Sequence, residues 1–369
     1  MKRDLRSLTL VELQSEFAAL SWPKYAAGQV FTWLWRKGVD DIAAMTNLSK
    51  ERRALLAERY SLSRLEVLRT LEDEDGTTKF TFRLEDGNVI ESVYIPESPP
   101  SPVPHPSSLA PTSGRRTVCV STQVGCKLGC AFCFTGTLGF KRDLAWHEIA
   151  GQVLSVRAHV LRPSSPAPSP SPLAPSPISN VVFMGMGEPF LNYDATIEAA
   201  KTINAENGLG IGARRITIST SGIPDGIRAF TKVEQQFRLA LSLNASDDET
   251  RSKLMPVNKV HPLKEVMAAI RAYTDARNKR VTFEYVLVDG INNRDKDVKQ
   301  LDALLKGIPC KLNLIPLNPF PGCELKPPTP ESVETFARKL WPLVPAVTVR
   351  RSKGASILAG CGQLAGLSE

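Results

Sequence analysis

The chain of 369 residues lacks long apolar runs, an export signal and a paired set of cysteines. No uninterrupted apolar run reaches the roughly 18–20 residues that a membrane-spanning helix needs. Residues 1–6 are rich in basic side chains and lead into acidic positions without an apolar stretch, which argues against export. The seven cysteines are odd in number, which argues against a disulfide framework. We therefore expect a cytoplasmic protein with no membrane association.

Positively charged residues outnumber negatively charged ones by only a modest margin. Lysine and arginine number 46 against 38 acidic residues, a formal net charge of +8. This balance permits a nucleic-acid partner without requiring one. The length, with 42% hydrophobic residues, is sufficient for a large buried core in one to three domains.

The first part of the chain contains two segments of different periodicity. Residues 1–64 carry apolar residues at helical spacing and a basic side, so they predict a helical accessory domain. Its charged face is either simply solvated or contacts RNA, and both interpretations stay open. Residues 65–96 alternate instead, and the runs 79–84 and 89–95 around a Glu-Asp-Gly-Asn turn predict a small β hairpin.

Two segments are dominated by proline and serine. Residues 97–114 contain six prolines and residues 163–177 contain seven. Proline at this density blocks helices and central strands, so both segments are expected to be surface insertions. A docking role for them is the less favoured alternative.

From residue 115 to 350 the pattern alternates between strands and helices. β-type runs occupy 117–121, 178–184, 215–219, 237–242, 281–287 and 311–316. Helical patterns occupy 145–161, 194–206, 262–276 and 294–306. This order predicts an α/β fold, an open or partial barrel of six parallel strands with right-handed crossovers. Ligands bind at the carboxyl ends of such strands, where several motifs fall.

Three of the cysteines form a C-x3-C-x2-C motif: Cys126, Cys130 and Cys133. A structural zinc site needs a fourth ligand, but there is no second C-x2-C and none of the four histidines stands at a ligand spacing. Three thiolates on a 4Fe-4S cluster leave one iron open for a cosubstrate. Zinc with a remote fourth ligand stays an alternative.

Five motifs in order resemble the RlmN/Cfr family of radical S-adenosylmethionine (SAM) RNA methyltransferases. They are CVSTQVGC at 119–126, GMGEP at 185–189, STSG at 219–222, NPFPG at 318–322 and CGQL at 361–364. The resemblance implies a partial (β/α)6 radical SAM barrel with an N-terminal helical domain. It also implies methylation of C2 of an adenosine in 23S rRNA, at the peptidyl transferase centre, and of an adenosine next to the anticodon in tRNA.

The resemblance further implies roles for single residues. Cys126, Cys130 and Cys133 would hold the 4Fe-4S cluster. Cys361, in the C-terminal segment 351–369, would accept a methyl group, and Cys119 would resolve the RNA adduct by forming a disulfide with it. Glu91 would be a proton acceptor. The SAM-contacting positions would be Gly187, Glu188, Ser219, Ser242, Leu243, Asn244 and Asn318.

The resemblance implies two SAM molecules per turnover, a reductant such as flavodoxin or ferredoxin, and a monomer. Asn244 stands where some relatives have histidine, and asparagine cannot titrate near neutral pH. Two other functions stay open at this point. One is methylation of C8 of adenine, as in the Cfr branch; the other is a zinc-containing RNA-binding protein without catalysis.

Overall fold

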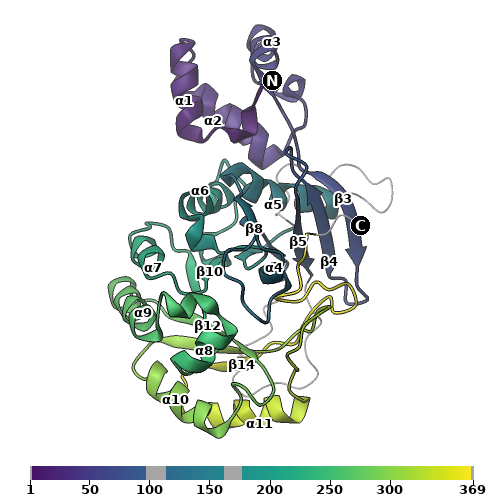
Figure 1. Ribbon diagram of the computed structural model, residues 1–369. Helices are drawn as coiled ribbons and strands as arrows, with labels where there is room; N and C mark the ends of the chain where they lie inside the picture. Colours follow the sequence, from purple (N-terminus) through teal and green to yellow (C-terminus); the bar gives the residue numbers. More distant parts are fainter. Residues whose placement is uncertain (1, 97–113, 162–176, 367–369) are drawn as a thin grey trace.

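The computed structural model describes residues 2–96, 114–161 and 177–366 (Figure 1). The two proline-rich segments therefore lie outside the described residues, apart from Gly114 and Pro177 at their ends. In the described part of the chain, every helix is too short or too polar to cross a membrane.

The N-terminal region is helical and lies at one end of the molecule, where Figure 1 shows it in purple. Its helices are α1 (Leu10–Ala19), α2 (Lys24–Phe31) and α3 (Lys50–Arg59). Thr9 caps α1 through a capping box with Glu12, which satisfies amide groups that the helix leaves unpaired. The two short strands β1 (Arg3–Asp4) and β2 (Tyr60–Ser61) pair in parallel and close this region.

One sheet of ten strands runs through the rest of the protein, in the order β14-β13-β12-β11-β10-β9-β6-β5-β4-β3. The strands from β6 to β14 in this order are parallel. Their bounds are β6 (Thr117–Cys119), β9 (Asn180–Phe183), β10 (Ile216–Thr220), β11 (Arg238–Ser242), β12 (Val281–Leu287), β13 (Cys310–Pro316) and β14 (Val347–Val349). The six predicted strands are confirmed, and β14 is a seventh that sequence reasoning did not identify because it spans only three residues.

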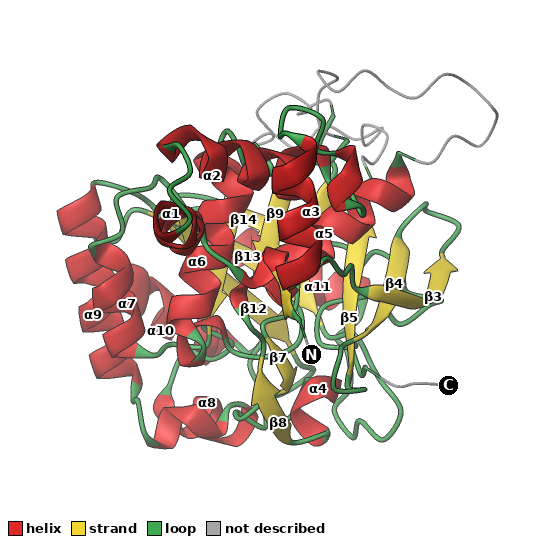
Figure 2. Cartoon of the chain, turned by 90° about the horizontal axis from the view of Figure 1, so that it is seen from above, coloured by secondary structure: helices red, strands yellow, loops and turns green. Residues whose placement is uncertain are grey.

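Helices connect the parallel strands and lie outside them, as Figure 2 shows. They are α5 (Trp146–Val160), α6 (Tyr193–Asn204), α7 (Pro224–Thr231), α8 (Asp248–Leu254), α9 (Leu263–Arg277), α10 (Asp295–Leu305) and α11 (Pro330–Leu340). Covered parallel strands are buried on both faces, which explains the continuous apolar runs in them. Leu239, Ala240 and Leu241 on β11, for example, are all buried.

The predicted hairpin is confirmed and extends the barrel sheet. Strands β4 (Thr78–Arg83) and β5 (Val89–Ile95) pair antiparallel, and β3 (Glu66–Glu72) adds a third strand. β5 in turn pairs with β6, with Val93 opposite Cys119. Backbone hydrogen bonding therefore continues from this segment into the barrel. The domain boundary expected between them stays a prediction.

A small second sheet supports the cysteine loop. Strands β7 (Gln123–Gly125) and β8 (Phe140–Asp143) pair antiparallel on either side of the loop and the short helix α4 (Phe134–Thr137). Gly125 has a φ of +76°, and a Cβ atom there would lie 1.9 Å from the carbonyl oxygen of Gly139. Only glycine allows the two backbone segments to approach so closely.

We expect Gly125→Ala to destabilise the protein by roughly 3 kcal/mol or more, because it adds a backbone clash to an unfavourable φ. Gly87→Ala is the matched control, since Gly87 has a similar φ of +80° but open space around it. The control should cost only about 1 kcal/mol. Urea unfolding followed by circular dichroism measures both, and equal losses would show that the close approach is unimportant.

Candidate active site

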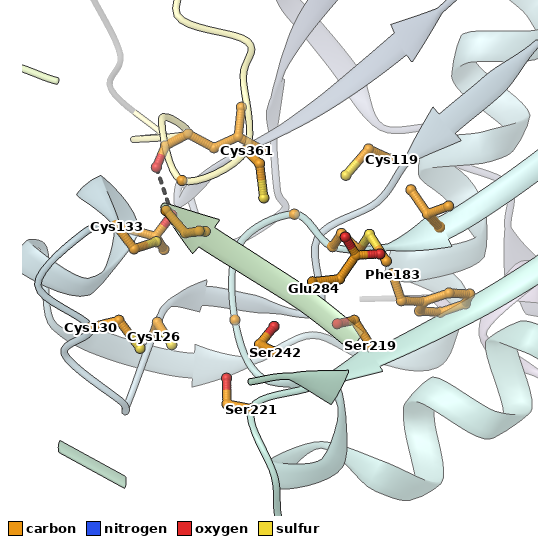
Figure 3. Close-up of a pocket in the computed structure, with 18 of the residues that line it drawn as sticks. Cys119, Cys126, Cys130, Cys133, Phe183, Ser219, Ser221, Ser242, Glu284 and Cys361 are labelled. Atoms are coloured by element: carbon orange, nitrogen blue, oxygen red, sulfur yellow. Dashed lines mark hydrogen bonds between the residues drawn. The ribbon is translucent and has the colours of Figure 1, made fainter. Parts of the chain in front are cut away.

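A pocket opens at the carboxyl ends of the parallel strands, where the cysteine loop and the C-terminal segment meet (Figure 3). Ten of the thirteen residues predicted for the site line it: Cys119, Cys126, Cys130, Cys133, Gly187, Glu188, Ser219, Ser242, Asn244 and Cys361. Glu91, Leu243 and Asn318 are the three that do not line it. The fold thus brings together residues that are up to 242 positions apart in the sequence.

The three cysteines of the C-x3-C-x2-C motif lie in the loop between β7 and α4 as free thiols. Burial raises the pKa of Cys126 to about 12, and burial together with the charges of its two neighbours raises the pKa of Cys130. Burial without a counter-charge disfavours the thiolate form of a cysteine. A bound metal centre supplies positive charge and so favours the thiolate.

The loop fits an iron–sulfur cluster in its donor set. Within the described residues, no three histidine, cysteine or acidic side chains are placed to hold a metal ion. A 4Fe-4S cluster makes a different demand, because each thiolate binds its own iron and the sulfurs surround a volume. Three free thiols facing one pocket meet that demand.

The turn after β9 reaches the pocket with Gly187 and Glu188. Gly187 has a φ of +98°, and a Cβ atom there would lie 2.5 Å from the Cβ of Gln123. The buried Glu188 accepts hydrogen bonds from the backbone amides of Phe190, at 3.0 Å, and of Ser221, at 2.7 Å. Burial raises the pKa of Glu188, while these hydrogen bonds lower it. The carboxylate therefore ties the ends of β9 and β10 together at the pocket wall.

The remaining predicted SAM positions divide into two groups. Ser219 is the penultimate residue of β10 and Ser242 is the last residue of β11, and both line the pocket. Asn244 follows with a φ of +58°, a conformation that asparagine tolerates well. The side-chain oxygen of Asn244 accepts a hydrogen bond of 2.9 Å from the amide of Val286 on β12. Leu243 is fully buried away from the pocket.

Cys119 and Cys361 reach the pocket from distant parts of the chain. Cys119 ends β6, whereas Cys361 lies in the C-terminal segment, and Figure 3 shows its sulfur directed into the pocket. Burial is the main cause that raises the pKa of Cys119 to about 12 and that of Cys361 to about 11. The positive charge of Arg350, which also lines the pocket, lowers both pKa values in part.

The C-terminal segment is attached to the antiparallel strands on both sides of Cys361. The Glu91 carboxylate accepts a hydrogen bond of 2.8 Å from the amide of Ala365. It also forms a buried ion pair with Lys79, whose Nζ lies 3.3 Å from Oε1 of Glu91 and 3.5 Å from the carbonyl oxygen of Leu358. The proton-acceptor role of Glu91 stays a prediction; its observed contacts are those of an anchor.

Asn318 is a second anchor. Its Nδ2 donates a hydrogen bond of 3.0 Å to the carbonyl oxygen of Cys361, and its Oδ1 accepts one from the hydroxyl of Ser352. It therefore holds the backbone at Cys361 itself, whereas Glu91 holds it at Ala365.

Two charged residues near the site escaped the sequence analysis. Arg251 is fully buried and donates to the carbonyl oxygens of Ser221, at 2.6 Å, and Leu243, at 3.0 Å, behind the pocket wall. Glu284 lines the pocket from the middle of β12. A signal for Glu284 was present, because a single carboxylate interrupts the apolar run 281–287. No sequence pattern marks Arg251.

We expect Lys79→Met to destabilise the protein by about 3–5 kcal/mol, because the substitution leaves the Glu91 carboxylate buried without its counter-charge. The control is Lys253→Met, which breaks the exposed pair with Glu249 and should change the free energy of unfolding by less than about 1 kcal/mol. Chemical denaturation measures both. A loss for Lys79→Met no larger than that of the control would contradict a structural role for the buried pair.

Comparison with known proteins agrees with this architecture. Residues 173–301 match the family model described as "Radical SAM superfamily", and residues 3–62 match "Ribosomal RNA large subunit methyltransferase N-terminal domain". The crystal structure of a radical SAM methyltransferase from Sphaerobacter thermophilus is 40% identical. It superposes with a TM-score of 0.86 over 99% of this chain and 100% of that chain.

Curated relatives match along almost the whole sequence. The dual-specificity RNA methyltransferase RlmN of Syntrophotalea carbinolica is 40% identical over 98% of this chain and 90% of its own. The protein of the same name from Syntrophus aciditrophicus is also 40% identical, over 98% of this chain and 96% of its own.

The barrel, the three-cysteine loop and the matches together define a SAM-dependent RNA methyltransferase of the radical SAM class. Within that class, the chain belongs to the RlmN family of dual-specificity RNA methyltransferases.

Proposed function

We propose that the enzyme methylates C2 of an adenosine in 23S rRNA and of an adenosine next to the anticodon in tRNA. The methyl group would pass through the sulfur of Cys361, and Cys119 would release the product. One observation carries this proposal: Cys119 and Cys361, from distant parts of the chain, line the same pocket as the three cysteines of the C-x3-C-x2-C motif. A methyltransferase acting by direct displacement has no need of this arrangement.

Cys126, Cys130 and Cys133 would hold the 4Fe-4S cluster at one end of the pocket. When bound, the cluster supplies the electron that cleaves SAM and so allows a hydrogen atom to be taken from an unactivated methyl group. Gly187 contributes close backbone approach, and the hydroxyls of Ser219 and Ser242 offer hydrogen bonds to the cosubstrate. The pocket is continuous from these residues to Cys361.

Cys361 is suited to carry a methyl group because its sulfur faces the pocket while its loop stays open to the outside. Gly360 and Gly362 flank it, and the backbone is held by Asn318 and by Glu91 through Ala365. These attachments fix the sulfur relative to the cluster loop.

Cys119 would resolve the adduct between Cys361 and RNA. In this step the thiolate of Cys119 attacks the sulfur of Cys361 and the disulfide forms. The carbon–sulfur bond breaks, its electron pair leaves with the methylene group on the base, and this group takes up a proton to become the methyl group. Burial raises the pKa of the Cys119 thiol to about 12, and a nearby cation favours its thiolate form. Arg350 is the cation that favours the thiolate of both cysteines.

The RNA substrate would also contact the N-terminal helical region. The relatives are named for dual specificity, and the matched N-terminal domain model is that of rRNA methyltransferases. Both kinds of substrate, rRNA and tRNA, are therefore proposed for this chain. An external one-electron donor such as flavodoxin or ferredoxin would reduce the cluster, and the protein would act as a monomer.

The proposed site of methylation is tested on RNA from cells with and without this gene. Digests of 23S rRNA and of tRNA, analysed by liquid chromatography and mass spectrometry, should contain 2-methyladenosine only when the gene is present. Comparison with an 8-methyladenosine standard distinguishes the two possible products. Gene-dependent 8-methyladenosine in place of 2-methyladenosine would overturn the assignment to C2.

The role of Cys119 is tested with Cys119→Ala. This variant should accumulate RNA bound covalently to the protein, because the adduct at Cys361 cannot be resolved. Denaturing gels of purified protein with labelled RNA detect it. Cys323→Ala, at a half-buried cysteine outside the pocket, is the control and should accumulate none. Normal turnover by Cys119→Ala would exclude the resolving role.

A further inference from the structure

A row of polar side chains crosses four strands of the sheet and ends at the pocket. In the register of the parallel strands, Ser242 on β11 is opposite Glu284 on β12, Glu284 is opposite Asn313 on β13, and Asn313 is opposite Thr348 on β14. Residues opposite one another in neighbouring strands present their side chains to the same face. Glu284 and Ser242 line the pocket, whereas Asn313 and Thr348, on the next two strands, do not.

Hydrogen bonds along this row all point toward Glu284. The Thr348 hydroxyl donates to Oδ1 of Asn313 at 2.6 Å, and Nδ2 of Asn313 donates to Oε1 of Glu284 at 2.9 Å. The hydroxyl bond orients the amide, so that its NH2 group must face Glu284. One carboxylate oxygen is thereby fixed in place by two buried or half-buried residues.

The other oxygen of Glu284 is left over. Oε2 is buried, and no group in the described part of the chain donates a hydrogen bond to it. The nearest cation is Arg350, whose Nη1 lies 3.9 Å away, beyond hydrogen-bonding distance, on a side chain that is 49% exposed. A buried acceptor without a donor is unfavourable, so its retention in a binding pocket points to a donor that arrives with a ligand.

Glu284 faces the part of the pocket into which the Cys361 sulfur points. Figure 3 shows its carboxylate among the side chains around the pocket, with the sulfur of Cys361 directed into the same space. The charge of Glu284 also raises the pKa of the Cys361 thiol, which places the two groups within electrostatic reach. A base that approaches Cys361 in this pocket is therefore also within reach of Glu284.

The proposed substrate supplies the missing donor. In adenine, the exocyclic amino group on C6 and the C2 position lie on the same edge of the ring, separated only by N1. A base whose C2 approaches Cys361 therefore presents its amino group to a side chain close to Cys361. Guanine carries an oxygen in place of this amino group, and a carboxylate would repel it.

We infer that Glu284 is a specificity-determining residue, whose Oε2 accepts a hydrogen bond from the amino group of the target adenine. This inference rests on the proposed function, since it takes the methylated base to be adenine. Asn313 and Thr348 are positioning residues, which act by holding the carboxylate. Glu91 differs from Glu284 in that both of its oxygens already have partners in the protein.

The experiment pairs Glu284→Gln with two RNA hairpins, one with adenosine and one with purine ribonucleoside, which lacks the amino group, at the target position. In the Glu284→Gln variant the new amide oxygen accepts from Asn313, so an NH2 group faces the base and cannot accept its hydrogen bond. Glu284→Gln should lower kcat/KM for the adenosine hairpin about 10- to 100-fold relative to the unsubstituted protein. For the purine ribonucleoside hairpin, the two proteins should agree within about threefold. Glu249→Gln, at an exposed carboxylate on α8, is the control and should change neither value.

Equilibrium binding gives a second readout that does not depend on turnover. The dissociation constants of both hairpins, from fluorescence anisotropy, should show the same pattern, and the dissociation constant of SAM should be unchanged by Glu284→Gln. Equal losses for both hairpins, or weaker SAM binding with unchanged RNA discrimination, would overturn the inference.

Two further outcomes separate this inference from the proposed function. If the unsubstituted protein methylates neither hairpin, the proposed function fails, and the two RNA dissociation constants still decide the role of Glu284. If Glu284→Gln does not fold, the inference is tested by the dissociation constants of the unsubstituted protein for the two hairpins. A preference for adenosine over purine ribonucleoside of at least about tenfold in binding supports the inference, and equal binding overturns it.

Discussion

The attachment of the C-terminal segment across the open end of the barrel is the constraint on which the site depends. The barrel and the cysteine loop form most of the pocket wall. Only the C-terminal segment adds Cys361 to the pocket that Cys119 also lines. Figure 1 shows this segment, in yellow, reaching the region of β4 and β5. It is held there by the buried Lys79–Glu91 pair and by Asn318. The antiparallel strands β3 to β5 therefore serve the site by anchoring it, without lining most of it.

Buried charge is the second feature that organises the pocket. Glu188 accepts hydrogen bonds from backbone amides that follow β9 and β10, and Arg251 donates to backbone carbonyls that follow β10 and β11. Such groups are costly to bury alone, and here each is compensated by several hydrogen bonds. The ends of the parallel strands, where regular hydrogen bonding stops, are thereby held rigid. Glu284 differs from these two residues, since its Oε2 accepts no hydrogen bond within the described part of the chain.

Much of the fold could be predicted from the sequence because its signals are local. Apolar runs of strand length alternate with helical periodicity, and parallel strands with right-handed crossovers allow few other arrangements. The short strand β14 and the pairing of β5 with β6 could not be predicted. Three residues carry too little pattern, and pairing between distant strands leaves no local signal in either one.

For the site, the sequence by itself determined the chemistry that is available: three closely spaced thiols, two distant ones, and glycine and polar residues after the strands. Spacing is informative here because three thiols on one short loop can bind a single cluster. Only the tertiary structure decided that Cys361 and Cys119 line one pocket, and that Glu284 lines it too. It also decided that Glu91 does not line the pocket and instead anchors the C-terminal segment. These placements depend on strand register and on contacts between remote segments, which are properties of the assembled sheet.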